Sequence, residues 1–193
     1  MKSICVFAGS SLGKSSLYSE AAIDLGKEIV ISGYSLVYGG GSNGLMGVIA
    51  DSVIESGGEV KGVITEQLKK VELAHEGLTE LLVVSTMHER KAKMAQLSEA
   101  IIALPGGVGT WEEFYEALAW NQLGLQSKPI ILLNVDNYYL DLYNFSKKGV
   151  QEGFLPNSTF EDIHLVDSCK EAIKIVKNFK KRDVSNWFKR LKR

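Results

Sequence analysis

The stretch 104–113, LPGGVGTWEE, combines two kinds of chemistry. Its first half contains three glycines, which let the backbone approach a ligand closely and leave no side chains in the way. Thr110 is well placed to cap the helix that we expect over Thr110–Leu123, and backbone N–H groups at the start of a helix attract a phosphate. The first half of the stretch therefore predicts an anion site.

The second half places two carboxylates, Glu112 and Glu113, beside that anion site. One explanation is structural, because the helix dipole stabilises acids in the first helical turn by about 0.3–1 kcal/mol. The other is a functional role in the same site. The residues alone leave both explanations open for either glutamate.

A basic segment lies upstream, Met87–Lys91, which reads MHERK. The helix that we expect over about 86–97 would start at the carboxyl end of the strand 81–85, beside the exit of the strand 100–104. Arg90 and Lys91 would then face the same cleft as the glycine loop. There they would neutralise a phosphate or hold an acid in place, whereas at an ordinary surface the pair would simply be solvated.

Short apolar runs alternate with helical patterns along the whole chain. Runs that are apolar on both faces predict a sheet covered on both sides, and helical crossovers make such a sheet mostly parallel. We therefore expect an α/β fold, a single-domain, Rossmann-like, doubly wound and mostly parallel sheet with helices on both faces. The expected strands are Ser3–Ala8, Ser35–Tyr38, Val60–Thr65, Leu81–Ser85, Ala100–Leu104, Pro129–Asn134 and Ile163–Val166. The expected helices are Ser15–Ser32, Leu45–Ser56, about 86–97, Thr110–Leu123, about Tyr138–Gln151 and one from Ser168.

We expect this domain to cover residues 1–180 and a basic amphipathic helix to cover 181–193. From Lys177 the chain holds eight Lys and Arg residues against one acid, Asp183. The apolar residues that fall on one helical face are Val184, Trp187, Phe188 and Leu191. The favoured interpretation is a helix that docks on its own domain or on a second subunit, with nucleic acid or membrane contact as the minority alternative.

Doubly wound sheets bind ligands at the carboxyl ends of their strands, and two further glycine-rich stretches fall there. The stretch 9–15, GSSLGKS, is one residue short of a P-loop. The stretch 39–44, GGGSNG, fits a dinucleotide fingerprint but follows the second strand instead of the first. We expect both to contribute backbone to a pocket wall that comprises Gly9, Ser10, Gly40, Gly41 and Gly44.

The bulk composition argues for a cytoplasmic protein without nucleic-acid or membrane partners. The formal net charge is −1, so no global field attracts polyanions. The two cysteines, Cys5 and Cys169, are far apart, and Cys5 lies in an apolar run where a buried free thiol is usual. The N-terminal apolar run is too short for a signal peptide.

The sequence offers little for a metal or a redox cofactor. The three histidines, His75, His88 and His164, are scattered and form no HxxxH or HExxH pattern. No lysine stands in a local context that marks an anchor for pyridoxal phosphate. We therefore expect no metal and no cofactor.

The MHERK segment followed by PGGVGTWEE resembles the LONELY GUY (LOG) family, the cytokinin riboside 5′-monophosphate phosphoribohydrolases, often once labelled lysine decarboxylases. The resemblance runs from CVFAGSS through YGGGSNGLMG to NQLGLQSKPIILLNVDNYY, about 150 residues. It implies hydrolysis of the N-glycosidic bond of an adenosine 5′-monophosphate, often N6-modified, with release of free base and ribose 5-phosphate. It further implies that no metal or cofactor is needed and that the chain forms a homodimer with sites near the interface.

The resemblance also implies residue roles. Arg90 and Glu113 match the family's catalytic pair, and Glu72 matches a position that contacts the adenine. Val108 departs from the tyrosine of many members, which would alter substrate fit more than chemistry. The implied substrate-binding set is Glu72, Met87, Arg90, Lys91, Gly106, Gly107, Val108, Gly109, Thr110, Trp111, Glu112 and Glu113.

The chemistry of N-glycosidic bond cleavage suggests what each residue of the Arg90–Glu113 pair would do. Glu113 would stabilise the positive charge that develops on the ribose and orient or deprotonate the attacking water. Arg90 would hold that carboxylate and keep it ionised at neutral pH. The alternative from another class is a non-catalytic nucleotide-binding or carrier protein, since related Rossmann-like molybdenum-cofactor carriers share such glycine loops.

Overall fold

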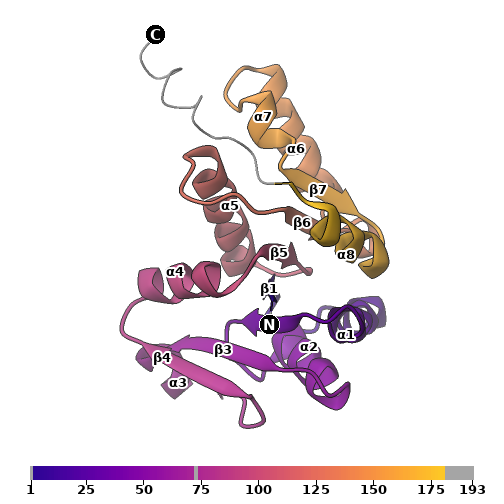
Figure 1. The fold of residues 1–193 in the computed structure, drawn as a ribbon. Coiled ribbons are helices and arrows are strands. Elements are labelled where there is room, and N and C mark those ends of the chain that lie inside the picture. The colour runs from indigo at the N-terminus through magenta and orange to yellow at the C-terminus, as the bar shows by residue number, and fades with distance from the viewer. Residues whose placement is uncertain (1, 72–73, 181–193) are drawn as a thin grey trace.

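The computed structural model describes residues 2–71 and 74–180, and the seven strands within them form one parallel sheet. The strand order is β4-β3-β2-β1-β5-β6-β7 (Figure 1). The strands are β1 Ser3–Phe7, β2 Ser35–Tyr38, β3 Val60–Thr65, β4 Glu80–Val84, β5 Ala100–Ala103, β6 Ile130–Leu133 and β7 Ile163–Val166. The expected Rossmann-like fold class is confirmed.

The strand order reverses at β1, which lies in the middle of the sheet. It pairs with β2 on one side, in the register Ser3↔Ser35, and with β5 on the other, in the register Ile4↔Ala100. Just beyond the strands, the Gly9 N–H donates to the Pro105 carbonyl at 3.1 Å, which joins the loops after β1 and β5. This switch point is where open α/β sheets bind ligands.

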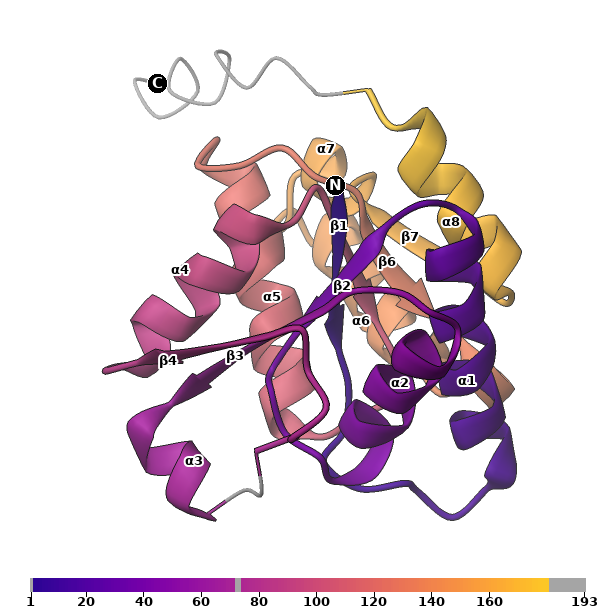
Figure 2. The same ribbon diagram turned by 60° about the horizontal axis from the view of Figure 1, so that its bottom comes forward.

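Helices cover both faces of the sheet because its strands are buried on both sides. One core packs α1, α2 and α8 against one face, and a second packs α4, α5, α6 and α7 against the other (Figure 2). The helices are α1 Ser16–Ile31, α2 Gly44–Glu55, α3 Glu66–Val71, α4 Met87–Leu97, α5 Val108–Gln122, η1 Val135–Asn137, α6 Leu140–Gln151, α7 Asn157–Phe160 and α8 Cys169–Asn178.

The helices α3, α7 and η1 were not predicted from the sequence, because they are too short to display a helical period. It also misplaced the start of α4. Because β4 lies at the sheet edge, with β3, β2 and β1 between it and β5, this helix does not begin beside the exit of β5. Instead α4 crosses the face of the sheet, where it contacts β3, β2 and β1.

Other expectations concern the termini and the thiols. Cys5 is a free, buried thiol in β1, as predicted. Across the residues that the structure describes, no helix is long and apolar enough to cross a membrane. The predicted helix 181–193 and Glu72 lie outside the described residues, and the domain boundary at residue 180 stays a prediction.

Candidate functional site

The glycine loop after β5 leads into α5 two residues earlier than the sequence indicated. Gly107, in an extended conformation, is the N-cap, and no described side chain caps it. Thr110 is therefore not the predicted cap but a buried residue of the first turn. The first helical bond runs from the Trp111 N–H to the Gly107 carbonyl at 3.1 Å. The N–H groups before Trp111 have no intrahelical acceptor and are available to an anion.

The helix start bears on the structural explanation for the glutamates. Glu112 and Glu113 lie in the second turn of α5, and the first turn holds no acid. Because the dipole effect falls off within the first turn, it accounts poorly for either carboxylate.

A cleft of about 340 Å³ opens beside the glycine loop, and no charged side chain of the described residues lines it. Packing is tight at its glycines Gly9 and Gly106, whereas a Cβ on Gly107 would meet open space. A Cβ on Gly106 would overlap the Thr110 hydroxyl, and one on Gly9 would lie 3.1 Å from the Gly106 Cα. The lining comprises residues 9–13, Tyr18, Leu45, residues 105–107, Trp111 and Tyr138.

Glu113 lies three residues after Thr110 on α5, and so on the same face of the helix as Thr110, but it is not among the residues that line the cleft. Its carboxylate accepts a hydrogen bond at 3.2 Å from the Arg90 Nη1, and the exposed fractions of the Arg90 and Glu113 side chains are 8% and 13%. The pair thus joins the first turn of α4 to the second turn of α5, as the resemblance implied that the two residues would act together.

Arg90 is fixed by the protein on every side. Its Nε donates to the Val63 carbonyl at 2.9 Å, its Nη2 donates to the Gly39 carbonyl at 3.2 Å, and its Nη1 also reaches the Met87 sulfur at 3.5 Å. A Cβ on Gly39 would overlap the guanidinium, so the glycine after β2 is required for Arg90 to pass. The sequence missed this role of Gly39, although its place after a strand was a signal.

The electrostatics of Glu113 differ from the expectation. Burial raises the pKa of its carboxyl to about 7, with Glu112 and Glu116 also raising it, while Arg90 and Lys91 lower it. Desolvation of the carboxylate therefore outweighs the attraction of the guanidinium. The prediction that Arg90 keeps Glu113 ionised at neutral pH is wrong in direction, because the pKa of the carboxyl is raised and not lowered.

Lys91 holds acids, the second of the two roles proposed for a basic residue here. Its Nζ lies 2.6 Å from Glu112 Oε1 and 3.0 Å from Glu116 Oε1. Burial alone would lower the pKa of Lys91, but the hydrogen bonds to both glutamates raise it. The sequence did not single out Glu116, although it lies four residues after Glu112 on the same helix face.

The remaining predicted residues fall into three sets: exposed side chains, residues that line the cleft, and glycines that do not line it. Met87, Val108 and Trp111 have exposed side chains on α4 and α5, at 42%, 74% and 38%. Gly9 and Ser10 line the cleft. The other three of the expected pocket wall lie behind it: Gly40 accepts from the His75 N–H, Gly41 bridges to Ala74, and Gly44 packs against the Ser10–Ser11 backbone.

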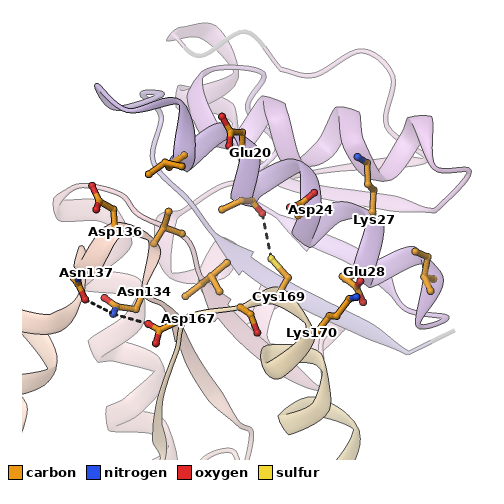
Figure 3. A pocket seen from close by; sticks show the side chains of 16 residues that line it. Glu20, Asp24, Lys27, Glu28, Asn134, Asp136, Asn137, Asp167, Cys169 and Lys170 are labelled. Carbon is orange, nitrogen blue, oxygen red and sulfur yellow. Dashed lines mark hydrogen bonds between the residues drawn. The ribbon is translucent and has the colours of Figure 1, made fainter.

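A larger hollow of about 820 Å³ lies elsewhere, between α1 and the segments that follow β6 and β7 (Figure 3). Figure 3 shows Asn134 bonded to Asn137 and Asp167 at its rim. Its charged lining is Glu20, Asp24, Lys27, Glu28, Asp136, Asp167 and Lys170. The excess of carboxylates makes it unsuited to an anion. Among the described residues, no group of three or more His, Cys, Asp or Glu side chains could hold a metal ion.

The fold and the site together define a class of protein. It is a Rossmann-like α/β protein in which a glycine loop, suited to an anion, leads into a helix without a side-chain cap, and a buried arginine–carboxylate pair lies on that helix and its neighbour. Comparisons with known proteins narrow the class. Residues 46–176 match the family described as "Possible lysine decarboxylase". The chain is 48% identical over 176 residues to the cytokinin riboside 5′-monophosphate phosphoribohydrolase LOG4 of Arabidopsis thaliana, covering 91% of this chain and 82% of that one.

A rice relative, the probable cytokinin riboside 5′-monophosphate phosphoribohydrolase LOGL9 of Oryza sativa subsp. japonica, is 50% identical over 173 residues, covering 90% of this chain and 75% of the relative. The chain belongs to the LOG family of cytokinin riboside 5′-monophosphate phosphoribohydrolases. The resemblance seen in the sequence is thereby confirmed.

Solved structures agree on the fold. The X-ray structure of TM1055 superposes with a TM-score of 0.72 at 24% identity, covering 93% of this chain and 100% of that one. The molybdenum cofactor carrier protein of Chlamydomonas reinhardtii superposes with a TM-score of 0.68 at 23% identity, covering 92% and 97%. At this identity the likeness concerns the fold alone.

Proposed function

We propose that this protein hydrolyses the N-glycosidic bond of an adenosine 5′-monophosphate, preferably N6-substituted as in a cytokinin riboside 5′-monophosphate. The products are the free base and ribose 5-phosphate. The relatives named for this reaction support the proposal. The observation that carries it is the buried Arg90–Glu113 pair, one helical turn beyond an uncapped glycine loop.

The glycine loop would hold the 5′-phosphate. The free N–H groups of Val108, Gly109 and Thr110 point along the helix axis toward its start, where the dipole favours negative charge. The adjoining cleft presents no acid from the described residues that would repel a phosphate. Fixing this remote group lets binding energy serve the reacting carbon.

Glu113 would act at the ribose. As the C1′–N bond breaks, positive charge develops on the sugar, and a nearby carboxylate stabilises it. Water then forms the new C1′–O bond and gives its proton to the carboxylate, which passes that proton to the departing base. Water is consumed, no electrons are exchanged and the reaction balances.

The raised pKa of Glu113 suits this double task. A group that must accept and then return a proton works best when its pKa lies near the working pH. Burial has raised the pKa of the Glu113 carboxyl to about 7, which lies in that range. Arg90, whose donors are engaged by Val63, Gly39 and Glu113, would act mainly by fixing the carboxylate.

We also propose a homodimer and a cytoplasmic location. Met87, Val108 and Trp111 expose apolar surface beside the site, on the helices that carry the catalytic pair. A second copy packed there would close the site from water. Light scattering during gel filtration would give the mass, and a monomer at assay concentrations would refute the dimer.

The cytoplasmic location is supported by the two cysteines, which are both free, as is usual in a reducing compartment.

The decisive experiment incubates the protein with N6-isopentenyl-AMP and with AMP, and separates the products by chromatography. We expect equal amounts of free base and ribose 5-phosphate, with faster release from the N6-substituted nucleotide. Glu113→Gln is the matched control, because it keeps the shape of the side chain and removes its charge. Tight nucleotide binding without base release would support a carrier protein instead.

A further inference from the structure

The loop after β6 adopts an unusual conformation. Asp136 and Asn137 have positive φ angles of 51° and 58°, a left-handed conformation that few non-glycine residues adopt. Asn134 stabilises it from a buried position: its Oδ1 accepts from the Tyr139 N–H at 3.0 Å, and its Nδ2 donates to the Asp167 carboxylate at 3.0 Å. Local strain of this kind persists where the surroundings fix it.

The effect of this loop is to aim two consecutive tyrosines at the glycine loop. The Tyr139 hydroxyl donates to the Leu104 carbonyl at 2.6 Å, and the Tyr138 hydroxyl donates to the Gly106 carbonyl at 2.5 Å. The Tyr138 ring is held edge-on between those of Tyr18 and Tyr139, with centroid distances of 5.9 and 5.0 Å. Tyr138 also lines the cleft, so its hydroxyl lies at the edge of the candidate anion site.

The bond to Gly106 fixes more than one carbonyl. In a trans peptide the C=O and the N–H point in opposite directions, so holding the Gly106 oxygen also sets the direction of the Gly107 N–H. Gly107 is the N-cap of α5 and makes no side-chain capping bond. A Gly–Gly peptide without such a restraint rotates easily, because neither residue has a Cβ.

We propose that Tyr138 is a positioning residue of the phosphate site, which holds the Gly106–Gly107 peptide in the orientation that presents its N–H to a phosphate. The inference rests on the proposed function, since it assumes that a nucleotide phosphate binds at this loop. Tyr138 sets affinity for the phosphate group and takes no part in bond cleavage. Neither Asn134 nor Asp136 touches the ligand; both act through the orientation of Tyr138.

The test compares AMP with adenosine, which differ only in the phosphate. Tyr138→Phe removes the hydroxyl and keeps the ring contacts with Tyr18 and Tyr139. In the Glu113→Gln background, where AMP is not turned over, titration calorimetry should show AMP affinity weakened about three- to tenfold, the value of one hydrogen bond, with adenosine affinity changed less than twofold. In turnover the KM should rise while kcat stays within twofold. Equal weakening for both ligands, or none for either, would overturn the proposal.

Tyr115→Phe is the matched control, since its hydroxyl bonds Ser146 at 3.2 Å and the residue lies outside the cleft lining. It should leave both affinities unchanged. The ratio of AMP to adenosine affinity is independent of any loss of folded protein. A parent protein that binds AMP but releases no base would refute the proposed hydrolysis and leave the role of Tyr138 measurable.

Discussion

Two hollows lie on either side of the loop 134–138, and they differ more usefully in charge than in size. The larger, of about 820 Å³, is lined by five carboxylates and two lysines (Figure 3). The smaller, of about 340 Å³, has no charged lining among the described residues. An anion is favoured where donors converge without competing acids, so volume alone would select the hollow that is less suited to an anion.

The starts of the helices explain the difference. At the larger hollow, the hydroxyl of Ser168 caps α8 by accepting from the Glu171 N–H at 3.3 Å, and Ser15 caps α1 in the same way at 3.3 Å from the Leu17 N–H. At the smaller, α5 starts at Gly107 with no cap from a described side chain. At α1 and α8 a side chain thus takes one of the first N–H groups, whereas at α5 no side chain of the described residues competes with a ligand for them.

The largest expected effect comes from removing the carboxylate of Glu113, which lies near the smaller hollow and not the larger one. Glu113→Gln should lower kcat for N6-isopentenyl-AMP by about 10³-fold, because it removes the general base and the stabilising charge. KM should change little, since the phosphate site is intact. Steady-state assays of base release measure both constants. Near-parental turnover in a folded variant would contradict the role given to Glu113.

Breaking the other half of the buried pair should cost stability as well as activity. Arg90→Met leaves a buried carboxyl and the carbonyls of Gly39 and Val63 without their donor, which we expect to cost about 3–5 kcal/mol. Urea unfolding followed by fluorescence gives this value. Lys93→Met, at a half-buried position of the same helix where the ammonium bonds Gln96, is the control and should cost less than about 1 kcal/mol. Similar values for both variants would show that the pair does not stabilise the fold.

The pH profile of the reaction tests the electrostatics around Glu113. If the ionised form of Glu113 acts as base, kcat/KM should rise about tenfold per pH unit below its pKa and level off above about 7. Glu112→Gln should move that inflection to lower pH, because Glu112 raises the pKa of Glu113. An inflection that stays in place in the variant would belong to the substrate phosphate instead.

Much of this arrangement was predictable from the sequence, and the parts that were not have physical reasons. Apolar runs and glycine-rich turns are local signals, so the fold class was predicted correctly and the glycine loop could be singled out as a candidate anion site. The pairing of Arg90 with Glu113 came from the resemblance. The partners of Arg90 include Val63 in β3, Gly39 after β2 and Glu113 in α5, and Tyr138 reaches Gly106 across 32 positions, so no local pattern marks them. The pKa of Glu113 depends on how deeply folding buries it, which spacing does not reveal.

The smallest expected effect concerns the larger hollow. Asp24→Asn combined with Glu28→Gln should change kcat/KM less than twofold at physiological salt, because charges beyond about 8 Å are largely screened there. The same assay of base release measures this, with the single Glu113→Gln variant as the sensitive reference. At low salt the double variant should react slightly faster, since two charges that repel an anionic substrate are gone. A tenfold loss of nucleotide affinity in the double variant would instead place the ligand in the larger hollow and reverse the comparison.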